Sequence, residues 1–257
     1  SEKSVLPKGA LFFILAKCPN HRYHQKMETK NSFAVPAAIV IAGIVVAVAI
    51  VYSVGKSNTV PVAGEPETIG DLEAMRPVSA NDHVRGDLKA PVMIVEYSDT
   101  ECPFCKRFHE TMKEVIKKYD GKVSWTYRHF PIPQLHSKAQ KESEATECAG
   151  KIGGPAMFWS YTDALYTATP SNNGLDPAEL PKIAKNLGLD TTQFNACVDS
   201  GEMAKRIDAD KENAAATGGN GTPWSILVGP DGKKYSINGA QPIESVSQMI
   251  DLALKTK

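Results

Sequence analysis

Two cysteines with the spacing i and i+3 lie in the segment Cys102–Cys105 (CPFC). They follow an apolar run, Pro91–Tyr97, that predicts a buried strand, and they open a segment, Pro103–Tyr119, that predicts a helix. A pair of thiols so placed can close into a disulfide. The first sulfur is also a good thiolate, because the helix dipole and the unpaired N–H groups favour negative charge there. The pattern predicts thiol–disulfide chemistry.

A CxxC pair can also be half of a zinc site, but zinc needs four ligands. The chain has no second CxxC. His109 follows Cys105 by four residues, yet no suitable fourth ligand is near, and we expect the His109 side chain to face solvent. We therefore predict no metal site and no organic cofactor.

Three further features favour redox chemistry. Glu96 lies six residues before Cys102 on the predicted strand, where a carboxylate could exchange a proton with the second thiol; a strand-end Glu in solvent is an equal alternative. Gly221–Pro223 precedes another predicted strand. A cis-proline there would present Thr222 to an extended peptide, and an ordinary trans-proline is the alternative. The turn Asp99–Glu101 is polar, and we expect it to be exposed.

The elements that position these residues follow the order β-α-β, a helical block, then β-β-α. Strands are predicted at 91–97 and 122–130 around the helix 103–119, and residues 137–217 predict five helices. A turn at 230–232 joins two more strands, 224–228 and 234–237, and an amphipathic helix follows at 242–255. Without the helical block, this is the order of a thioredoxin fold. We predict an α/β thioredoxin fold with an inserted helical subdomain, preceded by one transmembrane helix.

The apolar run 33–54 holds 22 residues without a charged side chain. As a helix it would span about 30 Å of hydrocarbon at ~1.5 Å per residue. It is too long for a secretory signal core, and no convincing cleavage site follows. We therefore predict an uncleaved anchor at 33–54, after a tail at 1–32 and before a flexible tether at 55–78 and a folded domain at 79–257.

The formal net charge is zero, but residues 1–32 carry six Lys/Arg against two Glu, which gives +4. Positive charge before the span predicts a cytoplasmic tail and a domain in the periplasm or outside the cell, on a single-pass protein of the cell membrane. An oxidising compartment suits disulfide chemistry. No basic face argues for nucleic acid as a partner.

The runs Glu96–Cys105 (EYSDTECPFC) and Gly221–Trp224 (GTPW) together resemble the DsbA-like thioredoxin superfamily, and most of all its membrane-anchored bacterial branch. The resemblance covers about residues 80–255. Each motif alone is weak, but the combination is specific.

The resemblance implies a role for each matching residue. Cys102 is the nucleophile and Cys105 resolves the mixed disulfide, while Glu96 assists proton transfer. The loop with Thr222 and Pro223 contacts substrate. Pro103 and Phe104, between the thiols, are assigned to the same substrate surface.

Cys148 and Cys197 both lie in the helical block. An oxidising compartment disfavours free thiols, and many relatives of this branch hold a second disulfide in the insertion. The resemblance thus implies a structural Cys148–Cys197 disulfide, with two buried free thiols as the alternative. Cys18 is left over in the predicted cytoplasmic tail.

The expected function is an oxidase that introduces disulfides into unfolded or reduced secreted proteins. Family oxidases usually carry His where this chain has Phe104, so a reductase or isomerase stays an alternative, as does a non-catalytic chaperone or adaptor. Isomerases usually need a dimerisation domain, for which the tether is too short and too polar; we expect a monomer. The resemblance also implies a quinone-linked membrane partner that reoxidises the pair.

Overall fold

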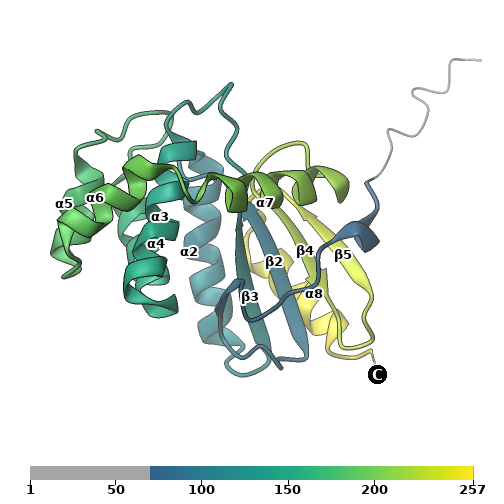
Figure 1. Ribbon diagram of the computed structural model, residues 1–257. Helices are drawn as coiled ribbons and strands as arrows, with labels where there is room; N and C mark the ends of the chain where they lie inside the picture. Colours follow the sequence, from purple (N-terminus) through teal and green to yellow (C-terminus); the bar gives the residue numbers. More distant parts are fainter. Residues whose placement is uncertain (1–69, 257) are drawn as a thin grey trace, which may run out of the picture. The chain divides into compact units, whose positions relative to one another are not determined.

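The computed structural model describes residues 70–256. Figure 1 shows a central sheet flanked by helices. The sheet has the strand order β1-β3-β2-β4-β5. β2 and β3 run parallel, and the other neighbouring pairs run antiparallel. The strands are β1 (His83–Arg85), β2 (Val92–Ser98), β3 (Val123–His129), β4 (Trp224–Val228) and β5 (Lys234–Asn238).

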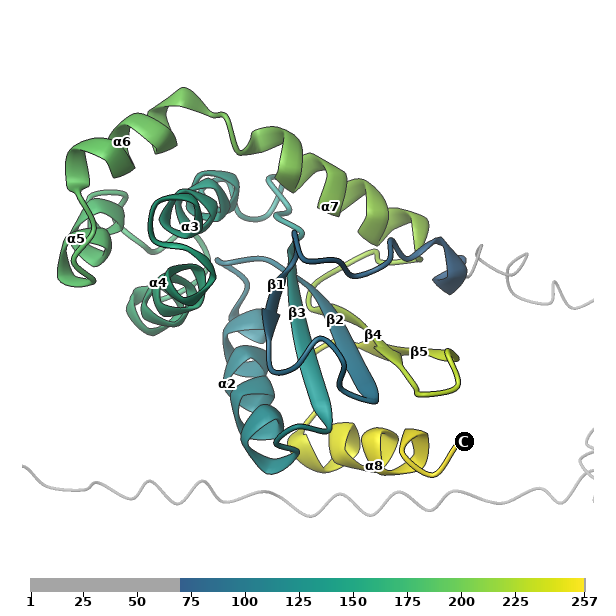
Figure 2. The ribbon, with the colours of Figure 1, turned by 60° about the horizontal axis from the view of Figure 1, so that its bottom comes forward.

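Helices cover both faces of the sheet, with α2 and α8 on one face and α7 on the other (Figure 2). After the short 3-10 helix η1 (Leu72–Ala74), the helices are α2 (Pro103–Lys118), α3 (Ala139–Gly153), α4 (Pro155–Ala168), α5 (Glu179–Asn186), α6 (Thr191–Ser200), α7 (Ala204–Ala216) and α8 (Ile243–Ala253). The predicted β-α-β, helical block and β-β-α order is confirmed.

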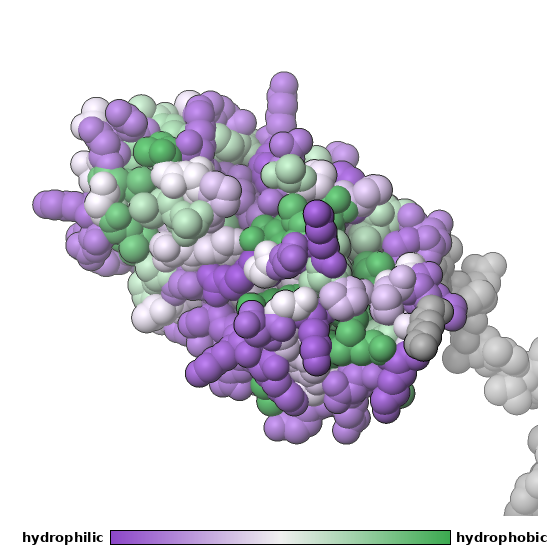
Figure 3. Space-filling view, turned by 90° about the horizontal axis from the view of Figure 1, so that it is seen from below, coloured by the Kyte–Doolittle hydropathy of each residue, from purple (hydrophilic) through white to green (hydrophobic). Residues whose placement is uncertain are grey.

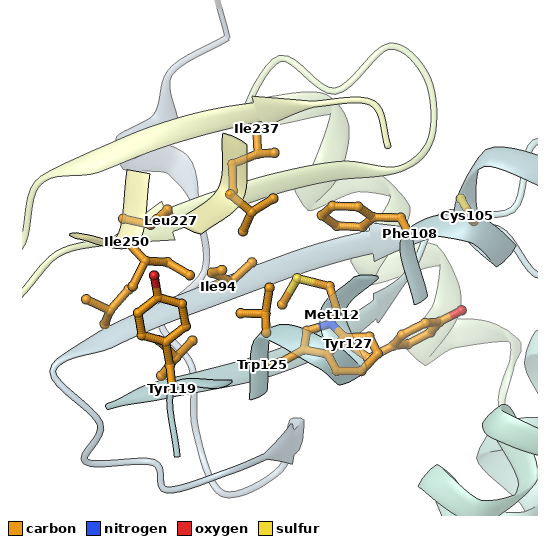
Figure 4. Packing of buried hydrophobic residues seen from close by; sticks show 14 of the residues in the cluster. Ile94, Cys105, Phe108, Met112, Tyr119, Trp125, Tyr127, Leu227, Ile237 and Ile250 are labelled. Carbon is orange, nitrogen blue, oxygen red and sulfur yellow. The ribbon is translucent and has the colours of Figure 1, made fainter. Parts of the chain in front are cut away.

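The main core lies between the sheet and the pair α2 and α8 (Figure 4). In α2 the buried apolar residues Phe108, Met112 and Val115 recur with the helical spacing, so one face of the helix packs on Ile94 and Trp125. Full burial of each such side chain contributes about 1.5–3 kcal/mol. This packing holds the N-terminus of α2 close to the C-terminal end of strand β2.

The segments that carry the CPFC and GTPW motifs meet at this end of the strands because of the strand register. Tyr97, near the end of β2, pairs with Arg128 of β3 on one side and with Trp224, the first residue of β4, on the other. The loop before β4 therefore lies beside the β2–α2 connection. In this way the fold brings Pro223 near Cys102 across more than a hundred residues of sequence.

The structure differs from the expected boundaries at the N-terminal side. Residues 70–78, assigned above to the tether, pack on the folded body: Met75 is buried, and the Arg76 guanidinium donates to the Asp210 carboxylate of α7 at 2.6 Å. Strand β1 was not anticipated. The tail and the anchor expected at 1–32 and 33–54 lie outside the described residues. Within residues 70–256, no helix is both long and apolar enough to cross a membrane.

Hydrophilic side chains cover most of the face seen in Figure 3, with apolar side chains gathered only in small groups.

The helical insertion, α3 to α7, has a second apolar cluster of its own, which includes Leu165, Phe194 and Cys197. Cys148 of α3 and Cys197 of α6 form a disulfide there, as predicted, with a Cα–Cα distance of 5.8 Å.

Candidate active site

Cys102 is the N-cap residue of α2, and Pro103 occupies the first turn, where its missing N–H costs nothing. One turn of helix places Cys105 below it, against the sheet. In the structure Cys102 and Cys105 are both free thiols and are not joined by a disulfide. Cys105 is completely buried, whereas Cys102 keeps 5% of its surface exposed. The two sulfurs thus have different access to an incoming molecule.

The environment separates the acidities of the two thiols. A hydrogen bond from Cys105, with further ones from the backbone N–H groups of Cys105 and Phe104, lowers the pKa of Cys102 to about 6. Burial, together with the hydrogen bond to Cys102, holds the pKa of Cys105 well above its usual range. Cys102 is therefore the thiolate of the pair at neutral pH, and Cys105 keeps its proton.

Glu96 lies on β2 beneath the thiols and is completely buried, which excludes the solvent-exposed alternative. Its carboxylate accepts hydrogen bonds from Ser98 Oγ at 2.7 Å and Trp125 Nε1 at 2.9 Å. Burial raises the pKa of Glu96 to about 7 despite these bonds. A carboxyl group with this pKa can give or take a proton near neutral pH.

The Thr222–Pro223 peptide bond is cis. The Thr222 carbonyl oxygen lies 3.5 Å from Cys102 Sγ. Thr222 itself is half-buried, and the Pro223 carbonyl accepts from Gly239 N–H at 3.0 Å, which ties the loop to the end of β5. The two motifs that carried the resemblance therefore lie in contact.

A cavity of about 490 Å³ opens beside Cys102. Its walls come from the start of α2, the loop after β3, the turn after α4 and the loop before β4, and its apolar lining includes Phe104, Ile132 and Leu135. Phe104 is 53% exposed and Leu135 is 67% exposed. Cys102 is itself part of the cavity lining.

The turn Asp99–Glu101 is fully buried, so the expectation of an exposed turn was wrong. The reason is a set of contacts from distant segments. The Asp99 carboxylate accepts from Ile132 N–H at 2.8 Å, and the Glu101 carboxylate accepts from Asn173 N–H at 2.6 Å and Thr169 Oγ at 3.3 Å. These bonds anchor two walls of the cavity to the residues just before Cys102.

The expectation that His109 faces solvent was also wrong. His109 is completely buried, and its Nε2 lies 2.6 Å from the Asp163 carboxylate of α4, because the insertion covers that side of α2. His129 and His136 also have carboxylate partners that the sequence did not reveal, Glu147 and Asp99 respectively. No group of three or more His, Cys, Asp or Glu in residues 70–256 could hold a metal ion.

Residues 79–252 match the family model described as thioredoxin. Among solved structures, DsbA2 of Pseudomonas aeruginosa is 28% identical, with a TM-score of 0.59, and the match covers 70% of this chain and 98% of that one. The thiol-disulfide exchange protein alpha-DsbA2 of Wolbachia pipientis is 19% identical with a TM-score of 0.58; the match covers 68% of this chain and 88% of that one and shows the fold alone.

The curated relatives carry a different name. The Na(+)/H(+) antiporter NhaA 3 of Salinispora tropica is 33% identical over 182 residues, which are 70% of this chain. The match covers only 26% of that antiporter, so the present chain spans about a quarter of the length of the curated relatives it matches.

Proposed function

The chain belongs to the thioredoxin family, and from this membership and the site geometry we propose that it is an extracytoplasmic thiol–disulfide oxidoreductase that introduces disulfides into reduced secreted proteins. The observation that carries the proposal is the difference between its two thiols. Cys102 has a pKa of about 6 beside an open cavity, and Cys105 is buried with a raised pKa. Such a difference suits directional exchange, in which partners react at the first sulfur.

The proposed reaction starts from the oxidised pair. A client thiolate attacks Cys102 Sγ; a bond forms between the client sulfur and Cys102 while the Cys102–Cys105 bond breaks, and Cys105 leaves as a thiolate that takes a proton. A second client thiolate then attacks the client sulfur and displaces Cys102. The client loses two electrons and two protons and gains a disulfide, and the pair becomes a dithiol.

The neighbouring residues have separate roles in this proposal. Glu96, with a pKa of about 7, supplies the proton that Cys105 needs. The Thr222–Pro223 loop, in contact with Cys102, holds an extended client segment, and Pro103 and the exposed Phe104 belong to the same docking surface.

We further propose that residues 33–54 anchor the protein in the cell membrane with the catalytic domain outside the cytoplasm. Reoxidation of the dithiol needs an electron acceptor, and a quinone-linked membrane protein is the partner that such a location would supply. A monomer suffices for this chemistry, because one chain provides every residue assigned to it.

The test is the redox potential of the Cys102–Cys105 pair in the full chain, equilibrated with glutathione. Stabilisation of the Cys102 thiolate favours the reduced form, so we expect an oxidising value, roughly −120 to −180 mV on the scale spanned by DsbA and protein disulfide isomerase. A value near −270 mV, that of thioredoxin, would contradict the oxidase and support a reductase instead. If the wild-type chain oxidised a reduced client no faster than a Cys102→Ser variant, both readings would be excluded and a non-catalytic role would remain.

A further inference from the structure

The imidazole of His136 lies in the wall of the cavity beside Cys102. Its Nδ1 is 3.0 Å from the carboxylate of Asp99, which is completely buried. The ring is itself largely buried, and no hydrogen-bond partner for Nε2 occurs among the described residues. The carboxylate therefore holds one nitrogen of the ring, and the other is free to meet a molecule in the cavity.

Asp99 connects this imidazole to the thiol pair. Its backbone N–H donates to Cys105 Sγ at 3.4 Å, while its side chain holds His136 and the N–H of Ile132. His136 is also fixed through its own backbone, because its N–H donates to the Ile132 carbonyl at 2.8 Å. The ring is thus oriented from two sides, as a general base must be.

Of the residues that line the cavity, Cys102 and His136 alone have titratable side chains; the others are apolar residues, glycine, proline, threonine and asparagine. Phe104, between the two thiols, offers no proton acceptor. Glu96 is completely buried and is occupied by Ser98 and Trp125. A thiol that enters the cavity therefore meets one basic group.

We propose that His136 is the general base that deprotonates the client thiol, held in position by Asp99. The inference rests on the proposed function and deepens it. The neutral imidazole takes the S–H proton at Nε2 while the client sulfur forms its bond to Cys102 Sγ and the Cys102–Cys105 bond breaks. Cys105 is protonated from Glu96, and the imidazolium returns its proton to solvent. In the opposite direction the same imidazolium protonates the departing client thiolate.

The test is the rate at which the oxidised full chain, in mild detergent, oxidises a reduced two-cysteine peptide, measured from pH 6.5 to 9.5. The substitution is His136→Asn, whose amide can still donate to Asp99 but lacks Nε2. An ordinary cysteine has a pKa of about 8.5, so about 1% is thiolate at pH 6.5. We expect a rate about 10- to 100-fold below wild type at pH 6.5 and within about threefold at pH 9.5, where the peptide is already ionised.

Two further variants separate base catalysis from a structural role. His136→Ala should regain rate on addition of imidazole at pH 6.5, which restores a base without restoring the side chain. Leu135→Ala, in the same cavity but without a proton acceptor, should change the rate by the same factor at every pH. The proposal is overturned if His136→Asn reacts as fast as wild type. It is also overturned if His136→Asn is slowed by the same factor at pH 6.5 and 9.5 and imidazole does not restore the rate of His136→Ala.

Failure of the general base and failure of the proposed function give different results. If the wild-type chain oxidises the peptide, Cys102→Ser does not, and His136→Asn matches wild type, only the role of His136 is rejected. If wild type and Cys102→Ser are equally inactive towards the peptide, both proposals are rejected.

Discussion

At the scale of single residues, two identical thiols acquire different properties from their positions in one turn of helix. Cys102 is the N-cap residue of α2 and lies at the helix N-terminus, whereas Cys105, three residues on, is completely buried in the core. Burial raises the pKa of a thiol, and donors at a helix N-terminus lower it. Burial dominates at Cys105. At Cys102 the hydrogen bond from Cys105 has the largest effect on the pKa, and the backbone N–H groups of the helix N-terminus add to it.

Alkylation of the reduced protein by iodoacetamide should label Cys102 first, with a rate that rises through a midpoint near pH 6. The thiolate is the nucleophile, so the rate increases with pH until ionisation is complete. Mass spectrometry of the labelled peptides measures both site and rate. The Cys105→Ala variant loses the hydrogen bond and should move the midpoint upward; a midpoint near 8.5 in the wild type would contradict the assigned thiolate.

Glu96 should make the folded protein less stable as the pH rises. Its pKa is about 7 in the fold against 4.5 ordinarily, so the folded state favours the protonated form, and stability is lost between these two values. A shift of this size corresponds to roughly 3 kcal/mol. The measurement is urea unfolding of the reduced protein at pH 4.5 and 8. We expect the free energy of unfolding of Glu96→Gln, relative to that of wild type, to be higher at pH 8 than at pH 4.5. Parallel pH dependence of the two proteins would show that Glu96 titrates normally.

At the scale of elements, the site exists because the ends of β2 and β3 and the start of β4 lie side by side in the sheet. β2 leads into Cys102, β3 leads into the loop with Ile132 and His136, and β4 begins just after Pro223. The turn after α4 completes the site, and its residues Ser171, Asn172 and Asn173 all have positive φ angles. Glu101 accepts from Asn172 N–H with its carbonyl and from Asn173 N–H with its carboxylate. Ser171 N–H donates to Thr169 Oγ1. Such left-handed residues cost energy and persist where surrounding bonds over-determine them.

We expect the Cys148–Cys197 disulfide to stabilise the helical insertion and to have little effect on the reactivity of Cys102. Cys148 and Cys197 are 49 residues apart and join α3 to α6. In the chain-entropy description, a loop of this length contributes roughly 3–4 kcal/mol. Cys148→Ala/Cys197→Ala should lower the free energy of unfolding by about that amount in urea, while Cys102 stays reactive. Cys102→Ser/Cys105→Ser is the matched control, and an equal loss there would mean that the contribution is not specific to the insertion.

At the scale of the whole molecule, the insertion and the sheet form one body through α2. His109 of α2 pairs with Asp163 of α4, and Arg85 of β1 donates to the same carboxylate at 2.8 Å. On the opposite face, Met75 and Arg76 attach the N-terminal segment to α7. The folded body therefore begins several residues before the expected boundary, next to the segment that would lead to a membrane.

The predicted anchor is testable on the whole protein. Alkaline phosphatase, which is active only where its disulfides form, should be active when fused after Lys257 and inactive when fused after residue 32. Deletion of residues 33–54 should abolish activity of the first fusion. Activity in both fusions, or in neither, would contradict the predicted orientation.

Local sequence determined the elements and the kind of chemistry. An i, i+3 pair of thiols at the start of an amphipathic helix, a buried strand before it and a loop with Thr222-Pro223 before a hairpin are all properties of neighbouring residues. For this reason the predicted strand and helix order agrees with the structure. The Cys148–Cys197 disulfide, which the resemblance implied, is also present. The strand β1 and the 3-10 helix η1 were not predicted, because three residues are too few for a periodic pattern to be recognised.

Tertiary structure alone decided the environment of each group. Asp99 meets His136 across 37 residues, and Glu101 meets Asn173 across 72, so no local pattern indicates that this turn is buried. The burial that sets the pKa of Glu96 comes from packing of β2, β3 and α2, and the burial of His109 comes from α4. Spacing along the chain determines which groups are available, whereas desolvation and hydrogen bonding depend on segments that only the folded chain brings together.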